Sequence, residues 1–248
     1  MFDNNDRSND TSAARIFLPL CGKSIDLAYL ATHPQVSYVV GIDIVHDAVE
    51  QFMVEHPELS INEVQLSSYE CGMMDEQTAT TTCQTTRRKK SSIFRGPKVT
   101  FLVRDLFNLL NMTIDDRAKL MFNHHGAAWT HFTSIYDRGS LVAIHPSLRE
   151  KYITLMDELL EPGGTILLVS LDRRQTITDE SKLDGPPFSL NEVEIRKLYE
   201  SESWVESVTL LKDVDELTTD EERERWKTKG VVELYEMVYL IKKKNLIG

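Results

Sequence analysis

Seven stretches of the chain carry the apolar runs, or the alternation of apolar and polar residues, that are typical of β-strands. They lie at residues 15–20, 38–42, 99–104, 135–139 (the end of a strand), 165–171, 205–211 and 236–242. Apolar residues spaced three or four positions apart predict helices at about residues 24–32, 47–56, 148–159 and 191–200. This order predicts an α/β fold: a doubly wound, mostly parallel seven-stranded sheet with an antiparallel edge strand.

Two polar segments interrupt the alternation. Residues 1–14 carry few apolar side chains and are expected to form a disordered tail. Residues 60–97 include TATTTCQTTRRKKSS, which buries too little apolar surface to order itself. The RRKK cluster in this segment is more typical of a solvated loop than of a docking site for an acidic partner. We therefore expect one domain, residues 15–248, with a low-complexity insertion at about residues 60–97.

Composition narrows the classes of function. The net charge is -11, whereas nucleic-acid binders present a basic face, so we expect no nucleic-acid partner. No apolar run reaches the length of a membrane span, and the first residues lack the pattern of a signal peptide. The three cysteines have no C-x-x-C spacing, which favours a reducing compartment. We therefore expect a cytoplasmic protein without a membrane partner, and a monomer.

The tripeptide Gly22-Lys23-Ser24 matches the end of a P-loop, but it is not one. The P-loop pattern G-x-x-x-x-G-K-[ST] needs an early glycine, and that position is Phe17. The residues before Gly22 instead form a buried strand that runs into a tight turn, and Ser24 is placed to cap the helix that follows. A nucleoside triphosphate site is therefore disfavoured.

Three features fall at predicted carboxyl ends of strands, where doubly wound folds bind ligands. The turn Leu20-Cys21-Gly22 lets the backbone approach a ligand closely, Asp43 follows the second strand as a ribose-binding acid does, and Asp105 follows the third. Each feature also has a simpler explanation. These are an ordinary turn at Gly22, a helix or turn cap at Asp43 and, at Asp105, an ion pair with Arg104 or a solvated carboxylate. Their joint position favours a cofactor that contains adenosine.

The glycine pattern narrows the choice of cofactor. A dinucleotide pyrophosphate takes G-x-G-x-x-G, and this turn has a single glycine. An NAD-dependent dehydrogenase is thus a distant alternative. S-adenosylmethionine has no phosphate, and its carboxylate can meet the amides of the turn.

Several stretches resemble the thiopurine S-methyltransferase family: RIFLPLCGKSIDLAYLA with VVGIDI, IYDRGSLVAIHPSLREKY, LLEPGGTILLVSL and DGPPFSLNEVEIRKLY. The resemblance covers most of residues 15–242, and the PLCGK turn, the DRG-x-LVAI block and GPPF are specific in combination. It implies a Rossmann-like class I methyltransferase that moves a methyl group from S-adenosylmethionine to the sulfur of a thiol or thione.

The resemblance also implies roles for single residues. Its cofactor-binding residues are Leu20 and Gly22 at the methionine end, Asp43 at the ribose, Asp105 and Leu106 at the adenine, and Arg138 facing the active site. Its catalytic residues are Arg138 and, on the acceptor side, Arg225, with Arg223 as the alternative. Residues 185–188 would shape a wall of the acceptor pocket.

Methyl transfer to sulfur mainly requires orientation, exclusion of water and a deprotonated acceptor, because the sulfonium methyl is already activated. An aromatic thiol ionises near neutral pH, so we expect no strong base. Arg138 is expected to stabilise the thiolate. The alternative is a salt bridge to Asp137, which we expect to be structural.

Departures from the family pattern keep other functions open. Family members carry an N-terminal segment, containing Trp, that folds over the cofactor. Here fourteen polar residues without Trp precede the first strand, and Tyr136 stands where Trp usually precedes Asp-Arg-Gly. We expect a more exposed, more weakly bound cofactor. The alternatives are a halide/thiol methyltransferase and a catalytically impaired, cofactor-binding homologue.

The remaining reactive side chains are expected to be structural. His124, His125 and His131 have no carboxylate or Cys at a ligand-like spacing, so we predict no metal site. Cys21 has no evident His partner in the sequence, and we expect a small buried thiol.

Overall fold

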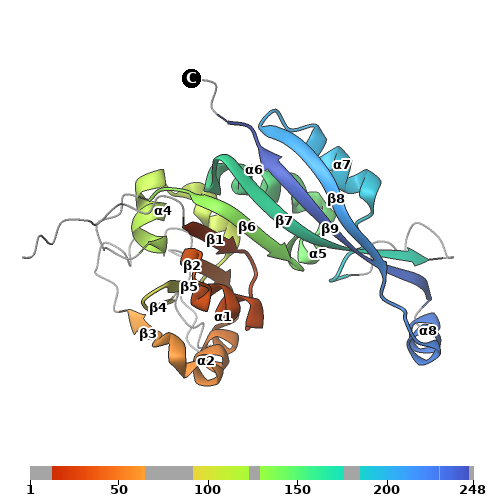
Figure 1. Cartoon of the computed structure of the whole chain (residues 1–248), viewed down its shortest axis with the longest axis horizontal. Helices are drawn as coiled ribbons and strands as arrows, with labels where there is room; N and C mark the ends of the chain where they lie inside the picture. Colours follow the sequence, from red (N-terminus) through yellow and green to blue (C-terminus); the bar gives the residue numbers. More distant parts are fainter. Residues whose placement is uncertain (1–12, 65–91, 123–128, 176–184, 229, 246–248) are drawn as a thin grey trace, which may run out of the picture.

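The computed structural model describes residues 13–64, 92–122, 129–175, 185–228 and 230–245 (Figure 1). A nine-stranded sheet in the order β3-β4-β5-β2-β1-β6-β7-β9-β8 forms its centre. The strands are β1 (Ala14–Leu18), β2 (Val36–Asp43), β3 (Asn62–Val64), β4 (Ser92–Arg95), β5 (Val99–Val103), β6 (Phe132–Arg138), β7 (Leu160–Gln175), β8 (Val205–Asp215) and β9 (Val231–Lys243). The first strand in the sequence therefore lies in the middle of the sheet.

The five central strands, β5, β2, β1, β6 and β7, are parallel, and both edges of the sheet are antiparallel. The predicted doubly wound α/β fold is confirmed. The sheet has nine strands rather than seven because the two ends of the stretch 60–97 pair as β3 and β4 and extend the β5 edge. The centre of the expected insertion, residues 65–91, and the expected tail, residues 1–12, lie outside the described residues.

The helices are α1 (Ile25–Thr32), α2 (His46–Glu55), α4 (Ile114–Met121), α5 (Ser140–Ala143), α6 (Arg149–Leu159), α7 (Glu192–Glu200) and α8 (Asp220–Lys227), with 3-10 turns η1 (Pro57–Leu59), η2 (Leu106–Asn111) and η3 (Pro146–Leu148). As predicted, Ser24 caps α1: its hydroxyl oxygen accepts from the amide of Asp26 at 3.2 Å. The sequence analysis did not predict α4, α5 and α8, which are short helices of 8, 4 and 8 residues.

The junction between α6 and β7 differs from the prediction. The helix ends at Leu159, as predicted, but β7 starts directly at Leu160 and not at residue 165, so that Pro162-Gly163-Gly164 lies within the strand. At its other end β7 runs beyond residue 171, because it pairs with β9 as far as Gln175. The partner strand, and not the local sequence, sets the length of β7.

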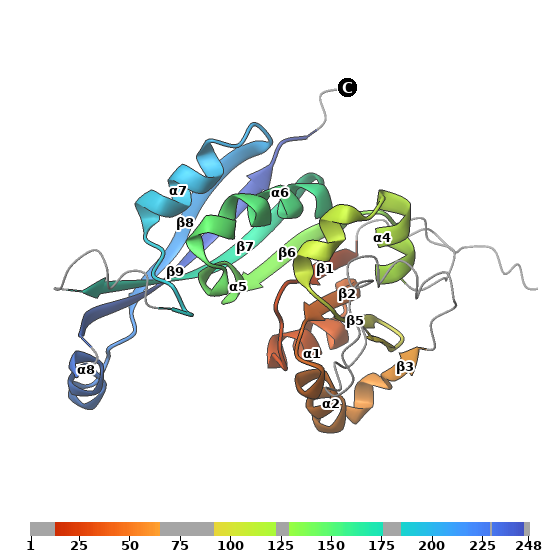
Figure 2. The ribbon, with the colours of Figure 1, turned by 180° about the vertical axis from the view of Figure 1, so that it is seen from behind.

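Helices cover the two faces of the sheet unequally. Figure 2 shows α5, α6 and α7 in front of β6–β9, whereas Figure 1 shows the opposite face of these strands with no described helix in front of it. That opposite face is covered by α1 and α2 only over β1, β2 and β5. Side chains along β7 show the difference: Ile166 and Leu168 are 0% exposed, whereas Leu167 between them is half-buried.

The far ends of β8 and β9 carry α8 above a small buried cluster of Leu217, Val231 and Leu234. In both views α8 lies apart from α1 and α2 (Figures 1 and 2). Neither α8 nor any other described helix is long and apolar enough to cross a membrane.

Candidate active site

The carboxyl ends of β1, β2, β5 and β6 meet at one edge of the sheet, where doubly wound folds bind ligands. Asp43 pairs with Val103 on the neighbouring strand. Ile16 pairs with Ser134, and continuing that register brings Arg138 level with the turn after β1. Five predicted site residues therefore meet at this edge: Leu20, Gly22, Asp43, Asp105 and Arg138.

The turn after β1 has an uncommon backbone. Leu20 and Gly22 both have positive φ, of 42° and 50°. For a residue with a side chain this conformation costs on the order of 1 kcal/mol, so Leu20 stores strain where the predicted methionine end of the cofactor lies. The amide of Cys21 donates to the carbonyl of Ile42 at 3.0 Å and holds the turn against β2.

Asp43 supports this turn and still has acceptor capacity. It is 8% exposed. Its Oδ2 accepts from the amide of Gly22 at 2.8 Å, and its Oδ1 accepts from the amide of Val45 at 2.8 Å. A carboxylate oxygen can accept two hydrogen bonds, so one position remains on each. This donor and acceptor arrangement fits the two hydroxyls of a ribose.

Asp105 and Leu106 differ in what they offer a ligand. Asp105 is exposed and caps η2, with Oδ1 accepting from the amide of Phe107 at 2.8 Å. The amide of Arg104 donates to the carbonyl of Asp43 at 2.9 Å, which ties this end of β5 to β2. Leu106 is 2% exposed and lies in the core. At this position only Asp105 presents a free side-chain oxygen.

Arg138 pairs with a residue that the sequence analysis did not name. Its Nη1 donates to Oδ2 of Asp26 on α1 at 2.9 Å, and its side chain is 54% exposed. The hydrogen bond to Asp26 raises the pKa of Arg138. The alternative of a salt bridge to Asp137 is wrong, because Asp26 is its carboxylate partner. The cation therefore stays accessible at the ligand edge.

Asp137 is structural, as predicted. It is fully buried and accepts from the amides of Ser140 and Leu141, each at 3.1 Å, and from the hydroxyl of Tyr152 at 2.7 Å. Burial raises the pKa of this carboxyl above its usual value, against the lowering effect of these donors. The residue fixes the start of α5, directly after Arg138.

The two predicted acceptor-side elements lie in different parts of the structure. Arg225 is on α8, far along β9 from Arg138 (Figure 1), and Arg223 on the same helix pairs with Asp215 at 2.8 Å. In the segment 185–188, the amide of Phe188 donates to the carbonyl of Val142 at 2.6 Å, and its ring is 7% exposed. That segment therefore lies beside α5, which begins two residues after Arg138, whereas α8 lies apart from the end of β6 (Figure 1).

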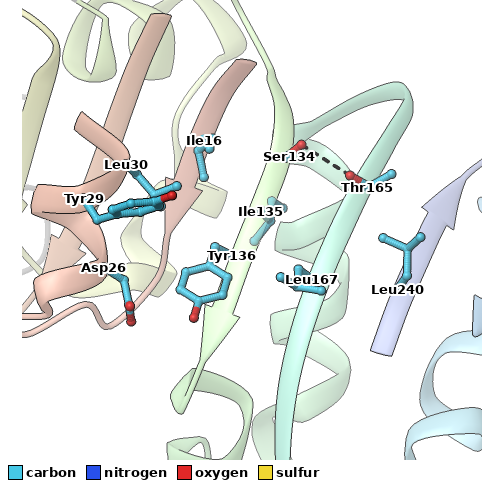
Figure 3. Close-up of a pocket in the computed structure, with 10 residues that line it drawn as sticks. All are labelled: Ile16, Asp26, Tyr29, Leu30, Ser134, Ile135, Tyr136, Thr165, Leu167 and Leu240. Carbon is cyan, nitrogen blue, oxygen red and sulfur yellow. Dashed lines mark hydrogen bonds between the residues drawn. The ribbon is translucent and has the colours of Figure 1, made fainter. Parts of the chain in front are cut away.

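A hollow of about 470 Å³ lies on the face of β6, β7 and β9 on which the described residues place no helix (Figure 3). Its lining residues are Ile16, Asp26, Tyr29, Leu30, Ser134, Ile135, Tyr136, Thr165, Leu167 and Leu240. The Asp26 carboxylate and the Tyr136 hydroxyl point to one end, and the other end carries a 3.3 Å hydrogen bond between Ser134 and Thr165. The sequence analysis missed it because these residues come from five separate elements.

The remaining reactive side chains are Cys21, the histidines and one group of carboxylates near a histidine. Cys21 is buried, and burial raises the pKa of its thiol well above the usual value, as expected of a packing residue. His124 and His125 lie outside the described residues, and burial lowers the pKa of His131. His46, Asp47 and Glu50 at the start of α2 place one ligand atom each within 4.8 Å of one another. The sequence analysis did not single out this group.

The chain is similar to known proteins over most of its length. The model of the family "Thiopurine S-methyltransferase (TPMT)" matches residues 3–244. The thiopurine S-methyltransferase of Vibrio atlanticus is 31% identical over 227 residues, which is 91% of this chain and 79% of that protein. The enzyme of the same name from Pseudomonas fluorescens is 30% identical over 92% of this chain and 82% of its own length.

Solved structures show the fold. The [4+2]-cyclase SpnF matches 94% of this chain and 76% of its own chain with a TM-score of 0.54 and 13% identity. Phosphoethanolamine N-methyltransferase 2 of Haemonchus contortus, solved with S-adenosyl-L-methionine, matches 94% of this chain and 49% of its own, with a TM-score of 0.53 and 12% identity. At such identities the likeness concerns the arrangement of the sheet and helices alone.

Proposed function

Because the chain belongs to the thiopurine S-methyltransferase family, whose methyl donor is S-adenosylmethionine, we propose that it methylates the sulfur of a small thiol or thione. The observation that carries this proposal is Arg138: a half-exposed cation at the carboxyl end of β6, level with the turn after β1. A cation at that place suits an anionic acceptor such as a thiolate.

The residues of the ligand edge fit the cofactor. The open acceptor positions on Asp43 suit the ribose hydroxyls. The Leu20–Gly22 turn allows close backbone approach by the methionine portion, and Asp105 offers a free oxygen for the adenine amino group. Bound S-adenosylmethionine supplies a methyl group that is activated by its sulfonium centre.

On the acceptor side the protein has little covalent chemistry to perform. The thiol loses its proton to solvent, and the guanidinium of Arg138 lowers the energy of the resulting thiolate. A sulfur lone pair then forms the new carbon–sulfur bond as the bond from the methyl group to the sulfonium sulfur breaks. Arg138 uses Nη1 for Asp26 and keeps further N–H donors for this sulfur.

Two other functions remain as alternatives: a halide/thiol methyltransferase, and a cofactor-binding homologue with impaired turnover. We further propose a small-molecule acceptor and no nucleic-acid partner, in view of the net charge of -11. We also propose that the protein is cytoplasmic and monomeric and has no membrane partner.

The cofactor site is tested by calorimetric titration with S-adenosylhomocysteine. The Asp43→Ala variant should bind about tenfold or more weakly, since hydrogen bonds to a charged group contribute roughly 1.5–3 kcal/mol. Asp220→Ala, an exposed acid on α8, is the matched control and should bind like the wild type. Equal binding by all three proteins would contradict the assignment of Asp43.

The acceptor side is tested by steady-state methylation of an aromatic thiol. Arg138→Met should lower kcat/KM by about 100-fold, the usual effect of removing a donor from a developing or bound anion. An unchanged kcat/KM would remove Arg138 from the mechanism. Turnover of halide but not of thiols would support the first alternative, and cofactor binding without any turnover would support the second.

A further inference from the structure

A buried serine connects the segment after β6 to the turn after β1. Ser140, the first residue of α5, is 0% exposed, and its hydroxyl donates to the carbonyl of Pro19 at 2.6 Å. Pro19 is also buried and directly precedes Leu20. The hydrogen bond therefore joins residues that are 121 positions apart, at the edge of the sheet where the predicted cofactor residues meet.

The carbonyl of Pro19 influences the shape of the turn. It belongs to the peptide group that leads into Leu20, and because a peptide group is planar, fixing its oxygen also fixes the orientation of that plane. Leu20 has a φ of 42°, which a residue with a side chain keeps only where its surroundings enforce it. On one side, β2 holds the turn through the amides of Cys21 and Gly22. The Ser140 hydroxyl holds it on the other side.

Ser140 is itself fixed by a buried network. Its amide donates to Oδ1 of Asp137 at 3.1 Å, and Oδ2 of Asp137 accepts from the hydroxyl of Tyr152 at 2.7 Å. Between Arg138 and Ser140, Gly139 has a φ of 87°, a conformation that glycine adopts without a penalty. Arg138 therefore stays half-exposed, whereas Ser140, two residues further on, is buried with its hydroxyl directed to the turn.

We propose that Ser140 is a positioning residue for the cofactor: its hydroxyl keeps the Leu20–Gly22 turn in the shape that receives the methionine portion of S-adenosylmethionine. This inference rests on the proposed function. Because Ser140 is 0% exposed, it acts through Pro19 and does not touch the cofactor. Without the hydroxyl, the buried oxygen of Pro19 loses this donor, and the turn is free to relax away from the strained conformation of Leu20.

A second buried serine provides a matched control. Ser170 on β7 is 1% exposed, and its hydroxyl donates to the carbonyl of Leu190 at 2.8 Å. The strand β6 lies between β7 and β1 in the sheet, and this hydrogen bond does not involve the turn. Ser170→Ala therefore removes the same kind of buried donor from a backbone carbonyl and leaves the turn after β1 intact.

The first measurement is amide hydrogen exchange in the protein without cofactor. Ser140→Ala should speed the exchange of the Cys21 and Gly22 amides by about tenfold, because a turn that is held on one side only opens more often. In Ser170→Ala the same amides should exchange within about twofold of the wild-type rate. This measurement reports on the turn whether or not a cofactor binds.

The second measurement concerns the cofactor. In calorimetric titration, Ser140→Ala should bind S-adenosylhomocysteine about fivefold more weakly, and Ser170→Ala within about twofold of the wild type. In steady-state methylation of an aromatic thiol, Ser140→Ala should raise the KM for S-adenosylmethionine by about fivefold and change the KM for the thiol by less than about twofold. A role in stability alone would lower the amount of folded enzyme and leave both KM values unchanged.

Ser140→Cys, which keeps a side chain of similar size with a weaker donor, replaces Ser140→Ala if the latter does not fold, and should weaken binding by about threefold. If the Ser140 variants bind S-adenosylhomocysteine like the wild type, or if Ser170→Ala weakens binding equally, the positioning role is wrong and the methyltransferase proposal is unaffected. If the wild type itself does not bind S-adenosylhomocysteine, the cofactor assignment fails and the positioning role fails with it. Hydrogen exchange then still shows whether Ser140 holds the turn.

Discussion

The two halves of the sheet are built differently. Around β1, β2 and β5, helices lie on both faces, and residues such as Leu18, Val39 and Phe101 are almost fully buried. Around β6, β7 and β9, the described helices cover one face, and Leu167 and Leu240 on the other face line a hollow. The first half holds Gly22 and Asp43, which we predict to bind the cofactor, and the second half holds Arg138.

The largest expected effect is the difference in lost unfolding free energy when a leucine is replaced by alanine in each half of the sheet. Leu18 and Leu240 lie on the same side of the sheet, but Leu18 is 3% exposed beneath the helices. Leu18→Ala should cost about 3–5 kcal/mol of unfolding free energy and Leu240→Ala only about 1 kcal/mol, since the latter leaves no closed cavity. Urea denaturation followed by circular dichroism measures both. Equal losses would show that Leu240 is covered in solution.

The next prediction concerns Asp137, whose side chain lies on the opposite face of β6 from that of Arg138. The pKa of this buried carboxyl is raised above 3.8, so the folded state holds the proton more tightly than the unfolded chain does. Its ionisation therefore costs stability as pH rises above that value. Relative to Asp137→Asn, the wild type should lose stability as the pH rises above about 4 and until the raised folded-state pKa is passed, by at most ~1.4 kcal/mol per pH unit.

The measurement for Asp137 is the difference between the two unfolding free energies across that pH range. Taking the difference cancels the titration of groups that both proteins share. Two parallel curves would mean that Asp137 titrates alike in the folded and unfolded states, in conflict with its burial.

A smaller effect concerns the turn that carries the cofactor residues. An added Cβ at Gly22 meets nothing closer than Oδ2 of Asp43 at 3.9 Å, and one at Gly230 meets nothing within 4 Å. Both have positive φ, so Gly22→Ala and Gly230→Ala should each cost about 1 kcal/mol through the backbone alone. Only Gly22→Ala should also weaken S-adenosylhomocysteine binding in calorimetry. If Gly230→Ala also weakens S-adenosylhomocysteine binding, the turn after β1 is not the specific cause of the weakening.

The smallest effect on stability belongs to the ion pair that joins the halves. The Asp26–Arg138 pair is partly exposed, so Asp26→Asn should change unfolding free energy by less than about 1 kcal/mol. Its effect should appear in catalysis, as a rise of about three- to tenfold in KM for an aromatic thiol, because Arg138 loses its orientation. Glu55→Gln breaks the exposed pair with Lys23 and should leave KM unchanged.

Local patterns in the sequence predicted the elements that depend on neighbouring residues. The apolar runs of β1, β2 and β5 and the cap at Ser24 were placed within a few residues, because burial and capping are written into adjacent positions. The predicted cofactor residues Leu20, Gly22 and Asp43 lie together because each follows the carboxyl end of a strand. Strand ends converge there in any doubly wound sheet.

Features set by distant partners were not predictable in this way. Asp26 and Arg138 are 112 positions apart, and no local pattern marks their pairing. The length of β7 depends on β9, and the hollow depends on where helices are absent. Even the acceptor-side arginine was sought on α8, which the structure places far from Arg138.

The central position of β1 has a consequence for synthesis of the chain. Among the described strands β1 is made before β2, its neighbour on one side, whereas its other neighbour, β6, begins only at Phe132. Until that strand emerges, one side of the innermost strand has unpaired backbone groups and apolar neighbours. Such an edge is a site for wrong pairing in a nascent chain.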